Sequence, residues 1–284
     1  MKKALYILGN GFDLAHEIHS SYAHFKEWLI KEGYNEHVQT LERHFCFECV
    51  NWSDYETALG SYDLDDIYEQ IAGDLSIDLD HLMRSQAIFE DAPDLILGTF
   101  WRDIKEKFYD WVNSIDISSA KRRFCLPANA KYLTFNYTLT LEKVYNITPD
   151  HILHIHGLVA SDDIIVGHNN YIAPNPEYGG NQWEMEEGVR ERIKGAMNDN
   201  YKDVQSIITK HRDYFTSLSD IEIIRVFGHS YNDIDMPYFQ KIKDSVSKEC
   251  KWILNWHSDN DKVNAENLIA QLGIPPENVE YINQ

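Results

Sequence analysis

Five polar clusters follow short apolar runs of this chain, and each contains glycine or asparagine. They are Gly9-Asn10-Gly11-Phe12-Asp13, Asn136-Tyr137-Thr138, His156-Gly157, Gly167-His168-Asn169-Asn170, and Gly228-His229-Ser230 with Asp233 and Asp235. In an open parallel sheet, ligands bind outside the carboxyl ends of the strands, so the clusters together predict one pocket. Taken singly, Gly9 and Gly11 also suit an ordinary turn, Asn136 a strand cap and His156 a core histidine.

The residue types in these clusters suit general acid–base chemistry. An Asn side chain such as Asn136 both donates and accepts hydrogen bonds, which fits a ribose or a positioned water. His156 is the natural base near neutral pH. A carboxylate from Asp13, Asp233 or Asp235 would stabilise a cation or orient the histidine. Chemistry of this kind needs no metal.

The glycine pair at the start of the chain favours a phosphate ligand but not an ordinary nucleotide-binding motif. A Gly-x-Gly turn between a strand and a helix presents backbone N–H groups to phosphates. The third glycine of the dinucleotide fingerprint would fall on Leu14, and no Walker sequence occurs. These departures argue against a nicotinamide dehydrogenase and against a P-loop hydrolase.

The elements that position these residues are short strands separated by helices. Strands are predicted at Ala4–Leu8, Tyr132–Phe135, Ile152–Ile155, Ile221–Phe227, Trp252–Trp256 and Val279–Ile282, with a weaker one at Ile164–Val166. The alternation predicts an α/β fold with a mainly parallel sheet and helices on both faces. We expect one domain over residues 1–284, with helical insertions at about 60–118 and 183–217. The first insertion carries 14 acidic and 4 basic side chains, which favours a solvated face.

The composition argues against several classes of protein. The formal net charge of −20 argues against direct binding to nucleic acid or to an anionic membrane surface. No apolar run is long enough to span a bilayer, and the apolar start of the chain is shorter than the core of a signal peptide. Cys46 and Cys49 have metal-like spacing but lack a second pair, so free thiols are predicted. We expect a cytoplasmic protein.

The clusters, in their order along the chain, resemble the bacteriophage abortive-infection AbiH family. The resemblance rests on Leu8 to Asp13, on Phe135-Asn136-Tyr137-Thr138 leading to Leu141-Glu142, on His154-Ile155-His156-Gly157, and on Phe227-Gly228-His229-Ser230 with Asp233 and Asp235. It covers nearly the whole chain. The family in turn distantly resembles the sirtuin-like, Rossmann-like NAD-binding domains of bacterial defence proteins.

The second resemblance implies roles for individual residues. Gly9 and Gly11 would face the phosphates of NAD, Asn136 the nicotinamide ribose, and His156 would be the base. Gly228 and Ser230 would match a Gly-x-Ser near the adenosine half. The other residues expected to bind NAD are Asn10, Phe12, Gly157, His229, Asp233 and Asp235. Asn10 stands where sirtuins have a small residue, and Asp13 replaces an expected hydroxyl. The four-cysteine zinc module of protein deacetylases is absent, so lysine deacetylation is not implied.

Three functions are consistent with the sequence. The first is a phage-triggered effector that cleaves NAD at the nicotinamide–ribose bond, with NAD as substrate and no tightly bound cofactor. The second is a module that binds NAD or another nucleotide metabolite without turnover. The third is a metal-dependent nuclease using Asp13, Asp233, Asp235 and His156. The expected partners are the small nucleotide, a second copy of the chain, and a phage-derived trigger.

Overall fold

The computed structural model describes residues 3–45, 52, 55–74, 82–159, 163–173 and 182–283. Cys46 and Cys49 lie outside these residues. Contacts divide the chain into two compact units, each described by itself. The sheet unit comprises Met1–Ser21, Val112–Ile165 and Asp203–Gln284, and the helical unit comprises Tyr22–Trp111 and Val166–Lys202. No helix among the described residues is long and apolar enough to cross a membrane.

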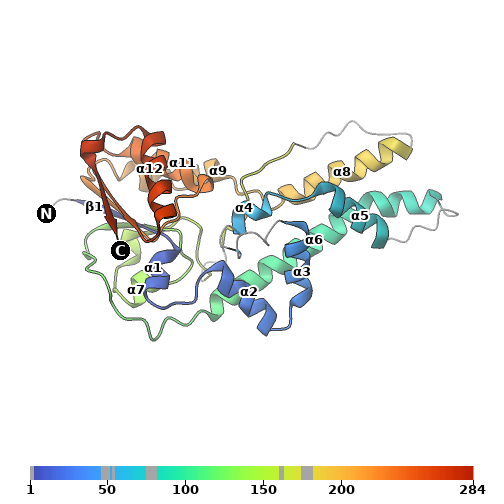
Figure 1. Ribbon diagram of the computed structural model, residues 1–284, viewed down its shortest axis with the longest axis horizontal. Coiled ribbons are helices and arrows are strands. Elements are labelled where there is room, and N and C mark those ends of the chain that lie inside the picture. The colour runs from blue at the N-terminus through green and yellow to red at the C-terminus, as the bar shows by residue number, and fades with distance from the viewer. Residues whose placement is uncertain are drawn as a thin grey trace. The chain divides into compact units, whose positions relative to one another are not determined.

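The sheet unit is built on six parallel strands (Figure 1). They are β1 (Ala4–Leu8), β2 (Lys131–Thr134), β3 (Ile152–His154), β4 (Ile223–Phe227), β5 (Lys251–Trp256) and β6 (Val279–Asn283), in the spatial order β3-β2-β1-β4-β5-β6. β1 pairs with β2 on one side and with β4 on the other. The strand order therefore reverses direction between β1 and β4, as in a Rossmann-like fold.

Helices cover both faces of this sheet, and the alternation of side chains along β1 shows why. Leu5 and Ile7 are fully buried in one cluster. That cluster includes residues of α9 (Val204–Lys210), α10 (Arg212–Thr216), α11 (Met236–Ser245) and α12 (Asp259–Leu272). Tyr6 and Leu8 point the other way, toward Phe12 and Leu141 of the short helices α1 (Asn10–Ala15) and α7 (Thr140–Lys143). The predicted α/β fold with a mainly parallel sheet and helices on both faces is confirmed.

The prediction of a weaker strand at Ile164–Val166 is wrong. These residues form no ladder; the N–H of Ile165 donates to the carbonyl of His156 at 2.9 Å, within the loop that follows β3. The polar cluster Gly167–Asn170 therefore follows no strand, and it belongs to the helical unit, where His168 forms an isolated bridge with Tyr201. A three-residue apolar run is too short for its pattern to separate a strand from a loop.

The helical unit packs around aromatic side chains. Its helices are α2 (Tyr22–Lys31), α3 (Asn35–His44), α4 (Tyr55–Leu59), α5 (Leu64–Asp74), most of α6 (Leu82–Ser114) and α8 (Gln182–Asn198). The ring of Phe25 on α2 lies 5.2 Å from the rings of both Phe108 and Trp111 on α6, measured between centroids. The periodic apolar residues of α2 and α6 thus form one core.

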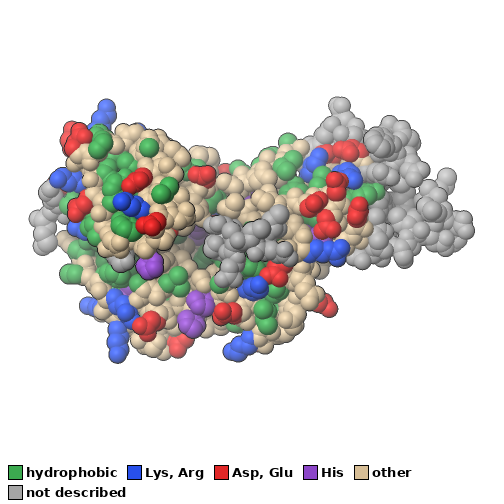
Figure 2. All heavy atoms as spheres, viewed as in Figure 1, with side chains coloured by type: hydrophobic (Ala, Val, Ile, Leu, Met, Phe, Trp, Pro, Cys, Tyr) green, Lys and Arg blue, Asp and Glu red, His purple; other side chains and the backbone are tan. Residues whose placement is uncertain are grey.

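Basic residues of α8 pair with the acidic helices of the same unit. Arg190 contacts Asp65 and lies 4.5 Å from the centroid of the Tyr68 ring on α5, and Arg192 lies 3.1 Å from Asp94 on α6. On the face shown in Figure 2, acidic and basic side chains are interspersed among the described residues. Part of the acidic charge predicted to be solvated is therefore neutralised within the unit.

Candidate functional site

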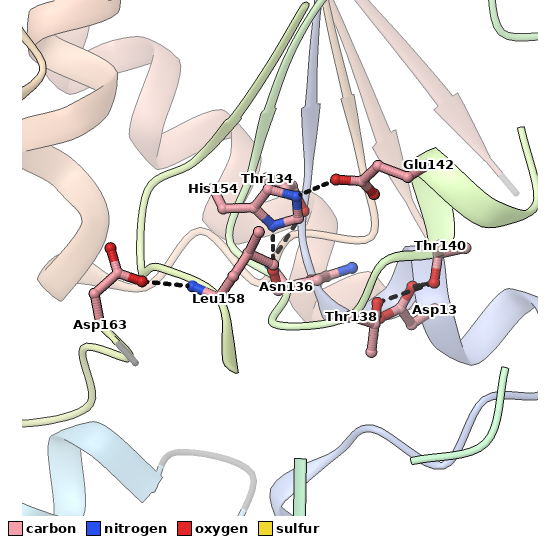
Figure 3. Close-up of polar contacts among 9 residues, drawn as sticks. All are labelled: Asp13, Thr134, Asn136, Thr138, Thr140, Glu142, His154, Leu158 and Asp163. Atoms are coloured by element: carbon pink, nitrogen blue, oxygen red, sulfur yellow. Dashed lines mark hydrogen bonds and ion pairs between the residues drawn. The ribbon is translucent and has the colours of Figure 1, made fainter. Parts of the chain in front are cut away.

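The four strand ends that carry the polar clusters share one edge of the sheet, because β1, β2, β3 and β4 run parallel. The sequence predicts that the strand ends at Gly9, Asn136, His156 and Gly228 lie at one edge of the sheet. The order and direction of the strands confirm this prediction. All four belong to the sheet unit. Figure 3 shows the part of this edge that follows β1, β2 and β3.

The glycine turn after β1 packs directly against the loop after β4. The N–H of Gly9 donates to the carbonyl of Phe227 at 2.9 Å, and the N–H of Gly11 donates to that of Gly228 at 2.8 Å. A Cβ on Gly9 would lie 2.5 Å from the Gly228 oxygen, and one on Gly11 would lie 2.7 Å from the Gly228 Cα. The turn needs glycine because two backbones meet there. The N–H groups that the sequence assigned to phosphates have protein acceptors in this structure.

Asp13 joins the turn after β1 to the loop after β2. Its side chain is fully buried and accepts hydrogen bonds from the hydroxyls of Thr138 at 2.6 Å and Thr140 at 2.8 Å (Figure 3). Burial raises the pKa of the Asp13 carboxyl, and hydrogen bonds from Thr138, Thr140 and Asn136 and the nearby His16 partly offset that rise. Asp13 therefore fastens the loop that carries Asn136.

Replacing Asp13 by Asn should make stability less dependent on pH. The raised pKa means that the folded state holds the carboxyl proton more tightly than the unfolded state does. The stability contributed by this group is thus fully present below the unfolded pKa and is lost as the pH rises through the folded pKa. Asn keeps both threonine contacts, since a hydroxyl also accepts.

The measurement is urea unfolding of both proteins at about pH 4.5 and about pH 7. We expect the free energy of unfolding of the wild type, measured relative to that of Asp13→Asn, to be smaller at the higher pH than at the lower pH. A difference that stays constant across this range would contradict the assignment.

His154 contacts the backbone of Asn136. Nδ1 of His154 lies 3.1 Å from the carbonyl oxygen of Asn136, and Nε2 lies 2.9 Å from a carboxylate oxygen of Glu142 on α7 (Figure 3). The His154 ring therefore links the backbone after β2 to α7. The Asn136 side chain is buried and hydrogen-bonds to Asp13.

A buried carboxylate lies between two histidines on the same edge. Oδ2 of Asp235 is 3.2 Å from Nε2 of His229, and Oδ1 is 3.9 Å from Nε2 of His156. The exposed fractions are 8% for Asp235, 6% for His229 and 4% for His156. The Phe135 ring contacts both imidazoles, and its centroid lies 5.2 Å from that of His156 and 4.5 Å from that of His229. Of the three carboxylates predicted to orient His156, Asp235 is the one that lies beside it.

The remaining predicted residues are more dispersed. Phe12 is buried with His16, Phe124 and Tyr145 in the core beneath α1. The Asn10 side chain accepts a hydrogen bond from Ser20 at 2.6 Å. Ser230 and Asp233 are exposed, and Gly157 has a φ of +77° in the turn after β3.

The metal alternative needs Asp13, Asp233, Asp235 and His156 at one point. The threonine hydroxyls hold both oxygens of Asp13, and Asp233 is exposed, so these four residues do not fit one shared ion. Among the described side chains, no group of three or more His, Cys, Asp or Glu is arranged to hold a metal.

Thr138, Thr140 and Glu142 were not predicted as site residues. The sequence places them within a few positions of Asn136, but nothing in their types indicates that two would bind Asp13 and the third His154. Their proximity in sequence to a polar strand end is the one signal that points to them.

The family comparison decides the identity. A model of the family described as Bacteriophage abortive infection AbiH matches residues 5–256, a range that includes β1 from Leu5 on, β2 to β5 and every predicted site residue. The chain belongs to the AbiH family. The resemblance seen in its motifs is thereby confirmed, and this AbiH chain has a role in bacteriophage abortive infection. No curated protein and no solved structure matches it.

Proposed function

We propose that this AbiH protein binds NAD at the carboxyl edge of its sheet and hydrolyses the nicotinamide–ribose bond in response to phage. The observation that carries the proposal is the buried His156–Asp235 pair on the edge where the strand order reverses. Ligands of open parallel sheets bind at this edge. The sirtuin-like resemblance of the motifs supplies NAD as the ligand, and this step is an analogy between folds.

The proposed reaction balances without a cofactor. Water attacks C1′ of the nicotinamide ribose, the bond between C1′ and the nicotinamide nitrogen breaks, and the bonding electron pair leaves with the nicotinamide. The water proton passes to His156, and the products are nicotinamide, ADP-ribose and one proton. Asp235 would favour the imidazolium formed on His156, and the Asn136 amide would orient the ribose or the water.

The geometry of the glycine turn modifies where the phosphates would bind. Because Gly9 and Gly11 donate to the carbonyls of Phe227 and Gly228, phosphate contacts at this turn require other donors or a shift of the β4 loop. We propose that Asn10 and the exposed Ser230 supply side-chain contacts on the two sides of this junction. A phage-derived trigger or a second copy of the chain would act by opening it.

Burial of His156 favours a second candidate function. A base that is 4% exposed is poorly placed to reach water, which suits a module that binds a nucleotide without turning it over. Retained binding with no product would identify that function.

The deciding experiment incubates NAD with protein purified from uninfected and from phage-infected cells. We expect nicotinamide and ADP-ribose in equal amounts, unaffected by a chelator, with the larger yield from infected cells. Calorimetry with NAD, under the same conditions, separates the two candidates. Binding without product supports the sensor, and neither binding nor product contradicts both.

A further inference from the structure

His229 lies in the β4 loop, enclosed by aromatic rings. Its ring centroid is 4.5 Å from that of Phe135, 5.0 Å from that of Phe239 and 5.5 Å from that of Tyr231. The side chain is only 3% exposed. His229 is among the residues predicted to bind NAD, but a ring so enclosed contacts protein on most of its surface.

The backbone determines which nitrogen of His229 carries the proton. The N–H of Tyr231 donates to Nδ1 at 2.8 Å, so Nδ1 is an acceptor. A neutral imidazole has one N–H, which must then be on Nε2. That atom lies 3.2 Å from Oδ2 of Asp235, so the proton faces the carboxylate.

The donor that sets this tautomer occupies an unusual backbone conformation. Tyr231 has a φ of +58°, a left-handed value that aromatic residues avoid. Its hydroxyl donates to the carbonyl of Asn255 on β5 at 3.0 Å, and its side chain is buried. The fold thus holds Tyr231 in a strained turn that directs its N–H at His229. Strain of this kind concentrates at functional sites.

We infer that His229 is a positioning residue whose Nε2–H holds the Asp235 carboxylate toward His156. One oxygen of Asp235 meets His229, and the other faces His156 at 3.9 Å. The groups around His156 include Asp235, the rings of Phe135 and Tyr137, and the ring of Tyr238 on α11. The inference rests on the proposed function for the role of His156 as base.

Two amide substitutions separate positioning from packing. A Gln side chain reaches about as far as Nε2 and donates to Asp235, whereas Asn reaches only as far as Nδ1 and accepts from Tyr231. We expect His229→Asn to lower kcat for NAD cleavage about tenfold to a hundredfold, with KM nearly unchanged. His229→Gln should retain kcat within about threefold of the wild type. His257→Gln, at an exposed histidine of the same unit, is the matched control.

If His229 only packed against its neighbours, His229→Asn would not lose more kcat than His229→Gln. Equal losses of kcat in the Asn and Gln variants, or a loss confined to KM, would overturn the inference. Both variants keep a polar side chain, and circular dichroism with thermal unfolding would identify a variant that fails to fold.

The second readout needs no activity. Histidine titration by NMR should show the midpoint of His156 at lower pH in His229→Asn than in the wild type. An Asp235 carboxylate that is no longer held toward His156 stabilises the imidazolium less. The midpoint in His229→Gln should match the wild type. If the wild type releases no nicotinamide, the proposed function fails and this titration decides the positioning role alone. An identical midpoint in all three proteins would overturn it.

Discussion

Replacing His156 by Ala should abolish nicotinamide release while NAD still binds. The proposed phosphate contacts lie elsewhere, so we expect affinity to fall by about tenfold, or ~1.4 kcal/mol. Turnover should fall by roughly 10²–10⁴-fold, because a base acts mainly in the transition state. Calorimetry measures the first effect and chromatography of free nicotinamide the second.

Asn136→Ala should show the same separation of binding from turnover, since in the proposed reaction its amide would orient the ribose or the water. His257→Ala removes an exposed imidazole from the same unit and should behave as the wild type. In infected cells, both site variants should accumulate normally and give no growth arrest. Wild-type protection from His156→Ala would remove His156 from the mechanism. Protection by the wild type with no loss of NAD would favour the sensor.

Replacing Gly228 by Ala should unfold much of the sheet unit. A Cβ there would lie 2.2 Å from the Phe12 nitrogen and 2.4 Å from the Gly11 carbonyl carbon, and the residue has a φ of +60°. Backbone atoms on both sides cannot yield as a flexible side chain would. We expect a loss of more than about 4 kcal/mol in the free energy of unfolding, which is exceptional for one methyl group.

Gly273 provides a matched control for this substitution. It ends α12 with a φ of +64°, and no atom lies within 4 Å of the position that its Cβ would take. Gly273→Ala should therefore cost only the left-handed conformation, roughly 1–2 kcal/mol. Urea unfolding of the two variants tests the difference. Similar losses would show that conformation, and not the contact between the two loops, makes Gly228 necessary.

The strands and their common edge could be predicted because the evidence for them is local. An apolar run such as Ala4–Leu8, ending in glycine, reports a buried strand regardless of what packs against it. The order of strands in space, with β4 beside β1, was beyond such evidence, because it depends on pairing between distant segments.

The partners of the site residues could not be predicted for the same reason. Asp13 and Gly11 are two positions apart, yet one is satisfied by threonines after β2 and the other by a carbonyl after β4. A carboxylate near a histidine and a carboxylate tying two loops together look alike in sequence. Only the fold shows that Asp235 has the first role and Asp13 the second.

The pairing of β1 with β4 has a consequence for protein synthesis. β1 leaves the ribosome first, but its partner strand is far downstream, with Ala4 beside Ile223, and both segments of the helical unit are translated in between. A nascent chain that has not reached β4 has neither Gly228 to close the glycine turn nor His229 and Asp235 to face His156. Such non-local pairing is slow to form. A protein built this way has no assembled edge at β1 to β4 until β4 and the loop after it have been translated.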